Sequence, residues 1–291
     1  MKGIERRVPD LWFTEYQTPN LRLGLRIKDV LLNKRSSYQH ILVVDTMEYG
    51  RVLVLDGAIQ LTEKDEFCYH EMMAHLLLCA HPNPEEVLVI GGGDGGVVRE
   101  VLKHETVKKV TLVDIDEEVI KASKTFFPAV SCALDDKCVE IRPMDALLFV
   151  KGHFNEFDVV IIDSTDPVDF ARGLFEPAFF KDVYVALKEE GMMVAQTESP
   201  FSEPDLLRDA VRGLRMAFEK VFLAWGVVPT YPTGLWTYAI GSKKLDPRMQ
   251  KRPAPQRTKY YSDAMHSLAF ELPPFINEII NGGNLEEAKG D

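Results

Sequence analysis

The chain has 291 residues, of which 46% are hydrophobic and 27% are charged, so it has ample apolar material for a core and lacks the composition of a disordered protein. Lysine and arginine total 34 against 45 aspartates and glutamates, which gives a formal net charge of −11. This charge argues against a protein that binds nucleic acid through its overall field. At about 150 residues a domain, the length predicts one large domain, alone or with a small one.

Neither a signal peptide nor a membrane span is expected. Residues 1–10 are charged and lack the apolar stretch of a signal peptide, and no apolar run approaches the roughly 20 residues needed to cross a bilayer. The four cysteines include no CxxC pair and no histidine at zinc spacing, which favours free thiols in a reducing compartment. We therefore expect a cytoplasmic protein that does not bind membranes.

The first part of the chain predicts short strands. Residues 21–27 alternate in polarity, and residues 40–45 do so in part. Residues 51–56 form a short apolar run that ends at an Asp-Gly turn signal, and residues 59–62 predict a further strand. We expect a small antiparallel β domain over residues 1–62.

Helices and strands alternate in the rest of the chain, residues 63–291. Residues 65–79 have helical spacing with one apolar side, and a break with two prolines follows them. The apolar strand 86–90 then runs into a glycine loop and a helix at 97–104. Later strands are predicted at 110–114, 139–142, 157–163, 191–197, 221–228 and 236–241, and later helices at 117–127, 177–188 and 205–218. This alternation predicts an α/β fold with a mostly parallel sheet and helices on both faces.

The glycine loop has the pattern of a nucleotide-binding loop. Residues 91–96 satisfy G-x-G-x-x-G between a strand and a helix, and Asp114 ends the next strand about twenty residues on. Glycines there allow a tight turn and a close approach of a ligand, and a carboxylate at Asp114 can accept hydrogen bonds from both hydroxyls of a ribose. This pattern serves an NAD enzyme and an S-adenosyl-type enzyme equally.

Further acids favour the S-adenosyl-type ligand. Asp145 follows the third strand of the series and Asp163 ends the fourth, so acids stand where the carboxyl ends of parallel strands form a ligand crevice. This arrangement resembles the S-adenosylmethionine-dependent transferases. The loop itself contains Asp94, which would repel a pyrophosphate and attract an amine, so a dinucleotide is disfavoured.

The sequence resembles the spermidine synthase (polyamine aminopropyltransferase) family from about residue 12 to residue 275. The matching segments follow the family order and are residues 56–62, 65–72, 81–84, 91–96, 163–167 and 229–234. The resemblance implies a small N-terminal β domain, a Rossmann-like (class I methyltransferase-like) catalytic domain and a homodimer or homotetramer. It implies transfer of the aminopropyl group of decarboxylated S-adenosylmethionine to a polyamine, usually putrescine, leaving 5′-methylthioadenosine and a proton. No cofactor is expected, because the decarboxylated donor is a co-substrate.

The resemblance also implies a donor site. Asp94 would face the aminopropyl end, Asp114 would hold the ribose and Asp145 would accept from the adenine amino group. The full donor set is Gln39, Asp94, Asp114, Asp145, Ala146 and Phe170. S-adenosylmethionine itself would bring a carboxylate to Asp94, so repulsion between like charges should exclude it.

For the acceptor, the resemblance implies that Asp163 takes the proton and that Tyr69 assists by a hydrogen bond. The polyamine set is His70, Asp94, Asp163, Ser164, Thr165, Asp166, Gln196 and Tyr231, with Glu198 a further candidate for the far ammonium. A carboxylate with an ordinary pKa, about 3.9, is a poor base for an ammonium. Its effect is therefore expected to come largely from position, with the nearby sulfonium lowering the pKa of the amine.

One segment departs from the family pattern. Residues 168–173 lack the usual Gly-Pro pair of the loop over the site, and Asp169 and Phe170 add charge and bulk there. Agmatine, cadaverine and spermidine therefore remain alternative acceptors. Two other functions remain possible on the same fold: an amine N-methyltransferase, and a binding protein without activity. Asp94 and the Asp163–Asp166 pair favour aminopropyl transfer. His70 and His75 stand one residue too far apart for a zincin helix, so no metal is expected.

Overall fold

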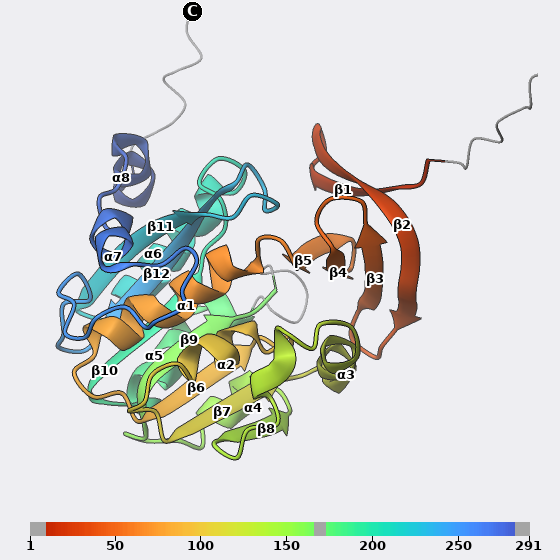
Figure 1. The fold of residues 1–291 in the computed structure, drawn as a ribbon. Helices are drawn as coiled ribbons and strands as arrows, with labels where there is room; N and C mark the ends of the chain where they lie inside the picture. Colours follow the sequence, from red (N-terminus) through yellow and green to blue (C-terminus); the bar gives the residue numbers. More distant parts are fainter. Residues whose placement is uncertain (1–9, 166–172, 283–291) are drawn as a thin grey trace, which may run out of the picture. The chain divides into compact units, whose positions relative to one another are not determined.

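The computed structural model describes residues 10–165 and 173–282, and the chain divides into two compact units, residues 1–64 and 65–291 (Figure 1). The sequence-based assignments of Asp166, Asp169 and Phe170 lie outside the described residues.

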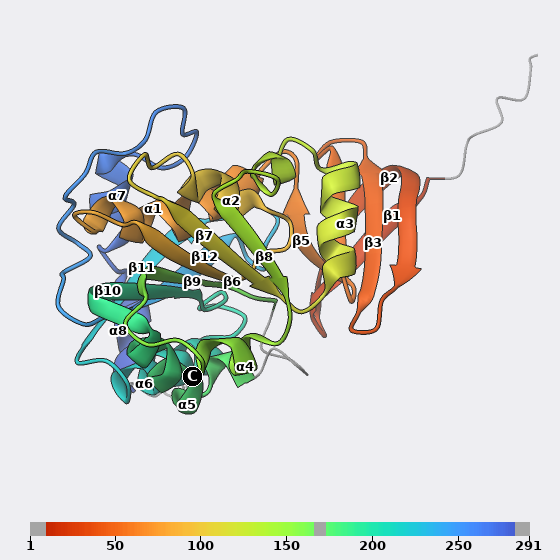
Figure 2. The ribbon, with the colours of Figure 1, turned by 90° about the horizontal axis from the view of Figure 1, so that it is seen from below.

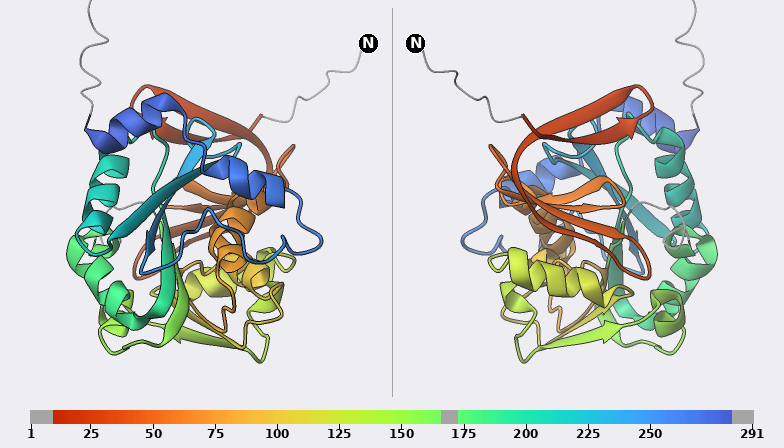
Figure 3. Two further views of the ribbon diagram at one scale, coloured as in Figure 1. Left: turned by 90° about the vertical axis from the view of Figure 1, so that its left-hand side faces the viewer. Right: turned by 90° about the vertical axis from the view of Figure 1, so that its right-hand side faces the viewer.

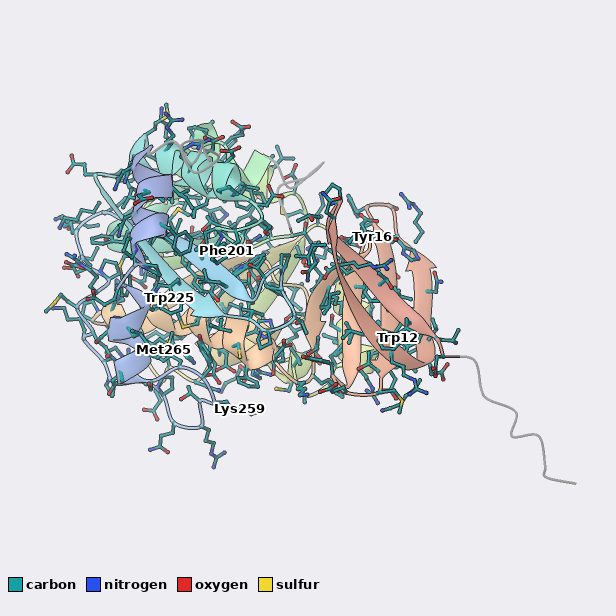
Figure 4. All side chains as sticks on the ribbon, turned by 90° about the horizontal axis from the view of Figure 1, so that it is seen from above. Trp12, Tyr16, Phe201, Trp225, Lys259 and Met265 are labelled. Carbon is teal, nitrogen blue, oxygen red and sulfur yellow. The ribbon has the colours of Figure 1, made fainter. Side chains whose placement is uncertain are left out.

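The first unit is a five-stranded antiparallel sheet in the order β1-β2-β3-β4-β5. Its strands are β1 (Trp12–Thr18), β2 (Leu21–Arg35), β3 (His40–Thr46), β4 (Arg51–Leu55) and β5 (Ala58–Thr62). The backbone N–H of Ile59 donates to the buried Glu15 carboxylate at 2.7 Å, which ties the first strand to the last. Two aromatic side chains of β1, Trp12 and Tyr16, are 58% and 70% exposed (Figure 4).

The second unit is built on a seven-stranded sheet in the order β11-β12-β10-β9-β6-β7-β8 (Figure 2). Its strands are β6 (Glu86–Gly91), β7 (Lys109–Asp114), β8 (Val139–Pro143), β9 (Phe157–Asp163), β10 (Leu187–Gln196), β11 (Lys220–Val227) and β12 (Leu235–Ser242). Strands β6 to β10 pair in parallel, and β12 pairs antiparallel with both β10 and β11. The mostly parallel α/β fold expected from the sequence is confirmed.

Helices lie on both faces of this sheet (Figure 3). Val89 and Ile161 point to the face that carries α1 (Glu66–Ala80), and Ile90 and Ile162 point to the opposite face. The remaining helices are α2 (Gly96–Val101), α3 (Glu117–Phe126), α4 (Ala146–Val150), α5 (Pro177–Ala186), α6 (Pro204–Arg215), α7 (Asp263–Ala269) and α8 (Pro274–Asn281), with a 3₁₀ turn at Ser131–Ala133. The sequence did not predict α4, α7 or α8.

The order of the strands changes direction beside β6. The chain runs outward from β6 through β7 to β8, then returns to pair β9 with the other side of β6. The direction of winding therefore reverses between β6 and β9, and the carboxyl ends of strands at such a reversal are where α/β sheets bind ligands.

Helix α1 is buried on almost all sides, whereas the sequence indicated a single apolar side. Part of the cover is the segment after residue 250: the N–H groups of Lys251 and Arg252 donate to the carbonyl of Cys79. Nearer the start of the helix, the carboxylate of Glu71 accepts the N–H groups of three consecutive residues, 259–261, at 2.8 Å. A buried carboxylate thus fixes a loop that crosses the helix.

Replacing Glu71 by alanine is expected to lower the free energy of unfolding by about 3 kcal/mol, because the N–H groups of residues 259–261 lose a charged acceptor in a buried place. Urea unfolding of the whole chain measures this change. Glu189→Ala removes an exposed glutamate that pairs with Lys244 and should leave stability unchanged. Equal stability of the two variants would contradict a stabilising role for Glu71.

Candidate active site

The ends of β6, β7 and β9 bring the glycine loop and two acids together. In the β-sheet register Gly91 lies opposite Asp163, and Val113, next to Asp114, is paired with Ile90. The sequence placed acids at the ends of these strands, and the strand order makes the strands neighbours.

Close approach of these acids explains the glycines of the loop. A Cβ atom on Gly92 would lie 2.7 Å from Oδ2 of Asp163, and one on Gly93 would lie 2.6 Å from Oδ2 of Asp114. Gly92 also has a φ of 68°, which side chains of L-residues rarely adopt. Any larger residue at these two positions would displace a carboxylate, so the loop is built around the acids.

Asp163 is buried, and one of its carboxylate oxygens accepts a hydrogen bond from a side chain. The Tyr69 hydroxyl donates to Oδ1 at 2.7 Å, while Oδ2 is buried with no hydrogen-bond partner among the described residues. Burial and then the charge of Asp94 raise the pKa of Asp163 to about 7, although His70 and the Tyr69 hydrogen bond lower it. The ordinary pKa assumed from the sequence is therefore wrong, because the sequence does not show how completely Asp163 is buried. A carboxylate with a raised pKa is a stronger base.

Tyr69 remains a hydrogen-bond donor. Burial and the charge of Asp163 raise the pKa of its phenol well above the usual value. The phenol therefore keeps its proton, and its hydrogen bond fixes the direction of the Asp163 carboxylate.

Asp114 is held by backbone groups on both oxygens. The N–H of Asp116 donates to Oδ1 at 2.8 Å and the N–H of Gly93 donates to Oδ2 at 3.0 Å. Burial is the largest influence on Asp114 and raises its pKa to about 6, against the lowering effect of these two N–H groups. Each carboxylate oxygen has two lone pairs, so both oxygens keep capacity for a ligand hydroxyl.

Asp94 occupies the glycine loop between β6 and α2. Its Oδ1 accepts the N–H of Gly96 at 2.6 Å and lies 3.4 Å from Nε2 of His70. Burial opposes its ionisation, but the charge and hydrogen bond of His70 lower its pKa below the usual value.

Aromatic rings stand beside Asp163. The ring of Tyr231 lies between Tyr69 and Trp236, with centroid distances of 5.4 Å and 4.7 Å. Tyr238, which the sequence did not single out, lies 6.2 Å from Tyr69 and has a buried hydroxyl with no partner in the described part of the chain. Its spacing of two residues from Trp236 on β12 was the available signal, because such residues share a face of a strand. Rings beside a carboxylate form a surface suited to an alkylammonium.

Other residues that the sequence assigned to the polyamine follow strands β9 and β10. The side chain of Gln196, at the end of β10, donates to the carbonyl of Ser164. Thr165 comes directly after Ser164 and is the last described residue before the gap in the description. Glu198 is buried with a φ of 62°, and its N–H donates to Gln196.

Two residues that the sequence assigned to the donor lie at the start of α4. Asp145 is the N-cap of α4, where its Oδ1 accepts the N–H of Leu147 at 2.8 Å, and Ala146 beside it is buried. Gln39 belongs to the first unit and is buried there, with its N–H donating to the Ser36 hydroxyl.

The described residues contain neither a membrane-spanning helix nor a cluster of metal-ligating side chains. No helix among them is long and apolar enough to span a membrane. Residues 10–165 and 173–282 also contain no group of three or more histidine, cysteine, aspartate or glutamate side chains placed to hold a metal ion.

Comparison with known proteins identifies the family. The model of the spermine/spermidine synthase domain matches residues 66–251, and that of the spermidine synthase tetramerisation domain matches residues 11–63. The chain is 50% identical over 273 residues to the polyamine aminopropyltransferase of Caldicellulosiruptor saccharolyticus, covering 93% of this chain and 98% of the relative. It is 49% identical over 279 residues to that of Moorella thermoacetica, covering 95% and 99%.

Solved structures agree with these sequence relatives. A crystal structure of spermidine synthase in complex with the transition-state analogue AdoDATO superposes with a TM-score of 0.91 at 39% identity, covering 97% of this chain and 99% of that one. Spermidine synthase from Thermotoga maritima gives a TM-score of 0.90 at 39% identity, covering 96% and 98%. The fold is therefore Rossmann-like, as expected, and the chain is an aminopropyl-transferring enzyme that belongs to the spermidine synthase family of polyamine aminopropyltransferases.

Proposed function

We propose that the chain transfers the aminopropyl group of decarboxylated S-adenosylmethionine to putrescine, giving spermidine and 5′-methylthioadenosine. The observation that carries the proposal is the buried Asp163, whose Oδ2 faces no protein donor among the described residues while Tyr69 holds Oδ1. An acceptor ammonium brought to Oδ2 can lose a proton there. The freed amine lone pair then attacks the carbon beside the sulfonium, forming a C–N bond as the C–S bond breaks and its electrons return to sulfur.

The donor has two positive centres, a sulfonium and a terminal ammonium, and the acids suit both. Asp94 takes the ammonium. S-adenosylmethionine carries a carboxylate beside this ammonium, and Asp94 would repel that carboxylate. Asp114 takes the ribose hydroxyls with the lone pairs that its backbone bonds leave. Asp145 and Ala146 take the adenine, and Gln39 and Phe170 complete the nucleoside contacts by family resemblance.

The raised pKa of Asp163 makes proton transfer from the acceptor less unfavourable than an ordinary carboxylate would allow. The sulfonium adds to this effect, because a nearby positive charge lowers the pKa of an ammonium. Tyr231 supplies an aromatic surface for the carbon chain beside Asp163. The family resemblance adds Ser164, Thr165, Asp166 and Gln196 to the amine contacts. The reaction requires no cofactor, since the sulfonium sulfur itself accepts the electrons.

We also propose that the enzyme is a homotetramer. The match of residues 11–63 to a tetramerisation domain supports it. Trp12 and Tyr16 also support it, because residues four apart share one face of a strand, and both rings are exposed on β1 (Figure 4).

We further propose that the enzyme works in the cytoplasm. The described cysteines are all free thiols, which supports this compartment.

The expected products test the reaction. Purified protein given decarboxylated S-adenosylmethionine and putrescine should release methylthioadenosine and spermidine, and S-adenosylmethionine should give neither. Mass spectrometry of the products with putrescine, agmatine, cadaverine and spermidine in parallel identifies the acceptor. Methylated putrescine formed from S-adenosylmethionine would make the enzyme an N-methyltransferase, and preference for a longer amine would change the acceptor.

Asp163→Asn should lower kcat by a factor of about 10² or more, because the amide keeps an acceptor for Tyr69 but cannot take a proton. Binding of methylthioadenosine, measured by calorimetry, should change little, since Asp114 and Asp145 hold the nucleoside. Asp135→Asn, at an exposed position, is the matched control. Wild-type turnover in Asp163→Asn would move the role of proton acceptor to another group.

The acid limb of the pH profile should lie near pH 7. Asp163 has a raised pKa in the folded enzyme, so its base form is present above about pH 7 and is lost as the pH falls through that value. The value of kcat/KM for the donor reports the free enzyme, and should therefore fall tenfold for each pH unit below the limb. A limb near pH 4 would show that Asp163 titrates as an ordinary aspartate.

A further inference from the structure

His70 lies between two carboxylates. Its Nδ1 is 2.6 Å from Oε2 of Glu66, one turn earlier on α1, and its Nε2 is 3.4 Å from Oδ1 of Asp94. A neutral imidazole has one N–H donor and one acceptor nitrogen, so it could satisfy only one of two carboxylates. The imidazolium donates from both nitrogens and satisfies both. The geometry therefore favours the charged ring, although the ring is buried.

The charged groups around the ring support this state. They are Glu66 on its own helix, Asp94 on the glycine loop and Asp163 at the end of β9, while the neutral ring of Tyr69 lies 5.6 Å away. Burial opposes the charge, but Asp94 and Glu66 together raise the pKa of His70 well above its usual value.

Glu66 is itself held in place by an arginine. Nη1 and Nη2 of Arg99 lie 3.1 Å and 2.8 Å from the two oxygens of Glu66, which is a two-pronged ion pair. Nε of Arg99 also donates to Glu100 at 2.9 Å, and this second contact fixes the orientation of the guanidinium. Burial disfavours the charge of Glu66, yet His70 and Arg99 lower its pKa to about 2. Glu66 is therefore ionised throughout the working range of pH.

The ring of His70 also fills the space over the glycine loop. A Cβ atom on Gly96 would lie 2.2 Å from two atoms of the ring, so residue 96 is glycine because His70 occupies its side-chain position. The N–H of Gly96 donates to the same Oδ1 of Asp94 that faces His70. Both contacts thus act on the same oxygen of Asp94, Oδ1, and fix the direction of its carboxylate.

From this geometry we propose that His70 is a charged positioning residue, held by the Glu66–Arg99 pair, that orients Asp94 for the ammonium of the donor. This inference rests on the proposed function, in which Asp94 takes that ammonium. The side chain of His70 then acts through Asp94, because both of its ring nitrogens already face carboxylates.

The first test is the protonation state of His70 in the unliganded protein. In ¹⁵N NMR of protein labelled at histidine, with the His70 signals assigned by their loss in His70→Asn, both ring nitrogens should stay protonated from pH 6 to pH 9. A ring that titrates between pH 6 and pH 8, or that carries one N–H at pH 7.5, overturns the proposal. This measurement needs no substrate and no further variant, so it decides the inference separately from the proposed reaction.

The second test removes the charge of Glu66 alone. Glu66→Gln should let His70 titrate within the same pH range and should raise the KM for decarboxylated S-adenosylmethionine about tenfold or more. Its acid limb should also move to higher pH, because the charge of His70 lowers the pKa of Asp163. A merely structural loss would lower the amount of active enzyme without moving the limb or the donor KM.

Glu117→Gln is the matched control, since Glu117 is the first residue of α3 and pairs with Lys121 four residues on, as Glu66 does with His70. The side chain of Glu117 is exposed, and this variant should keep wild-type kinetics. Equal donor KM values in Glu66→Gln and Glu117→Gln overturn the positioning role. Absence of turnover in the wild type would instead overturn the proposed reaction, and the NMR result would still stand.

Discussion

The close placement of three carboxylates away from solvent is the constraint on which the site depends. Asp163 is buried, and Asp94 and Asp114 are partly buried. Asp94, Asp114 and Asp163 stand at the glycine loop and at the ends of neighbouring strands, where burial and mutual repulsion raise the pKa of Asp114 and Asp163. Such a cluster is stable only where hydrogen bonds and positive charges offset it. Backbone N–H groups hold Asp114, a phenol holds Asp163, and the imidazole between Asp94 and Glu66 brings a counter-charge. In the proposed function, cationic substrates add the remaining positive charge.

Helix α1 supplies two of these offsets, Tyr69 and His70, from consecutive positions. The next residue, Glu71, fixes the 259–261 loop, and Asp65, just before the helix, accepts two hydrogen bonds from Thr230. Successive residues of a helix point in different directions, so one short segment reaches Asp163, the glycine loop and two distant loops at once. This requirement explains why the helix is buried on almost every side and why its polar residues are not confined to one solvent-facing stripe.

The sequence predicted the elements whose signals are local. Apolar strands that end in Asp114 and Asp163, and a glycine loop between strand and helix, can be read in short windows, and parallel pairing then makes them neighbours. The helices after residue 262 were not predicted because each is short, with bounds of Asp263–Ala269 and Pro274–Asn281, so its apolar spacing covers only about two turns. The pKa of Asp163 escaped as well, since burial is set by residues distant in sequence. The sequence pattern indicates that Gly96 lets a ligand approach the loop. In the structure, a side chain at residue 96 would collide with the ring of His70, and this contact between residues distant in sequence requires glycine there.

The proposed reaction moves a positive charge, and this movement separates the tasks of the acids. Before transfer the nucleoside carries the sulfonium and the aminopropyl ammonium. After transfer methylthioadenosine is neutral, and the polyamine has gained the aminopropyl ammonium. Its attacking nitrogen has given one proton to Asp163 and becomes charged again by forming the C–N bond. In the proposed site, Asp94 and Asp163 attract the donor but lose their hold on the nucleoside product, whereas Asp114 and Asp145 hold parts that the reaction leaves unchanged. Groups of the second kind bind substrate and product alike, and only groups of the first kind can favour the reacting state over both. Holding these carboxylates together away from solvent lowers the stability of the fold. They lie where the proposed reaction would take place, so the same charges can stabilise the reacting state.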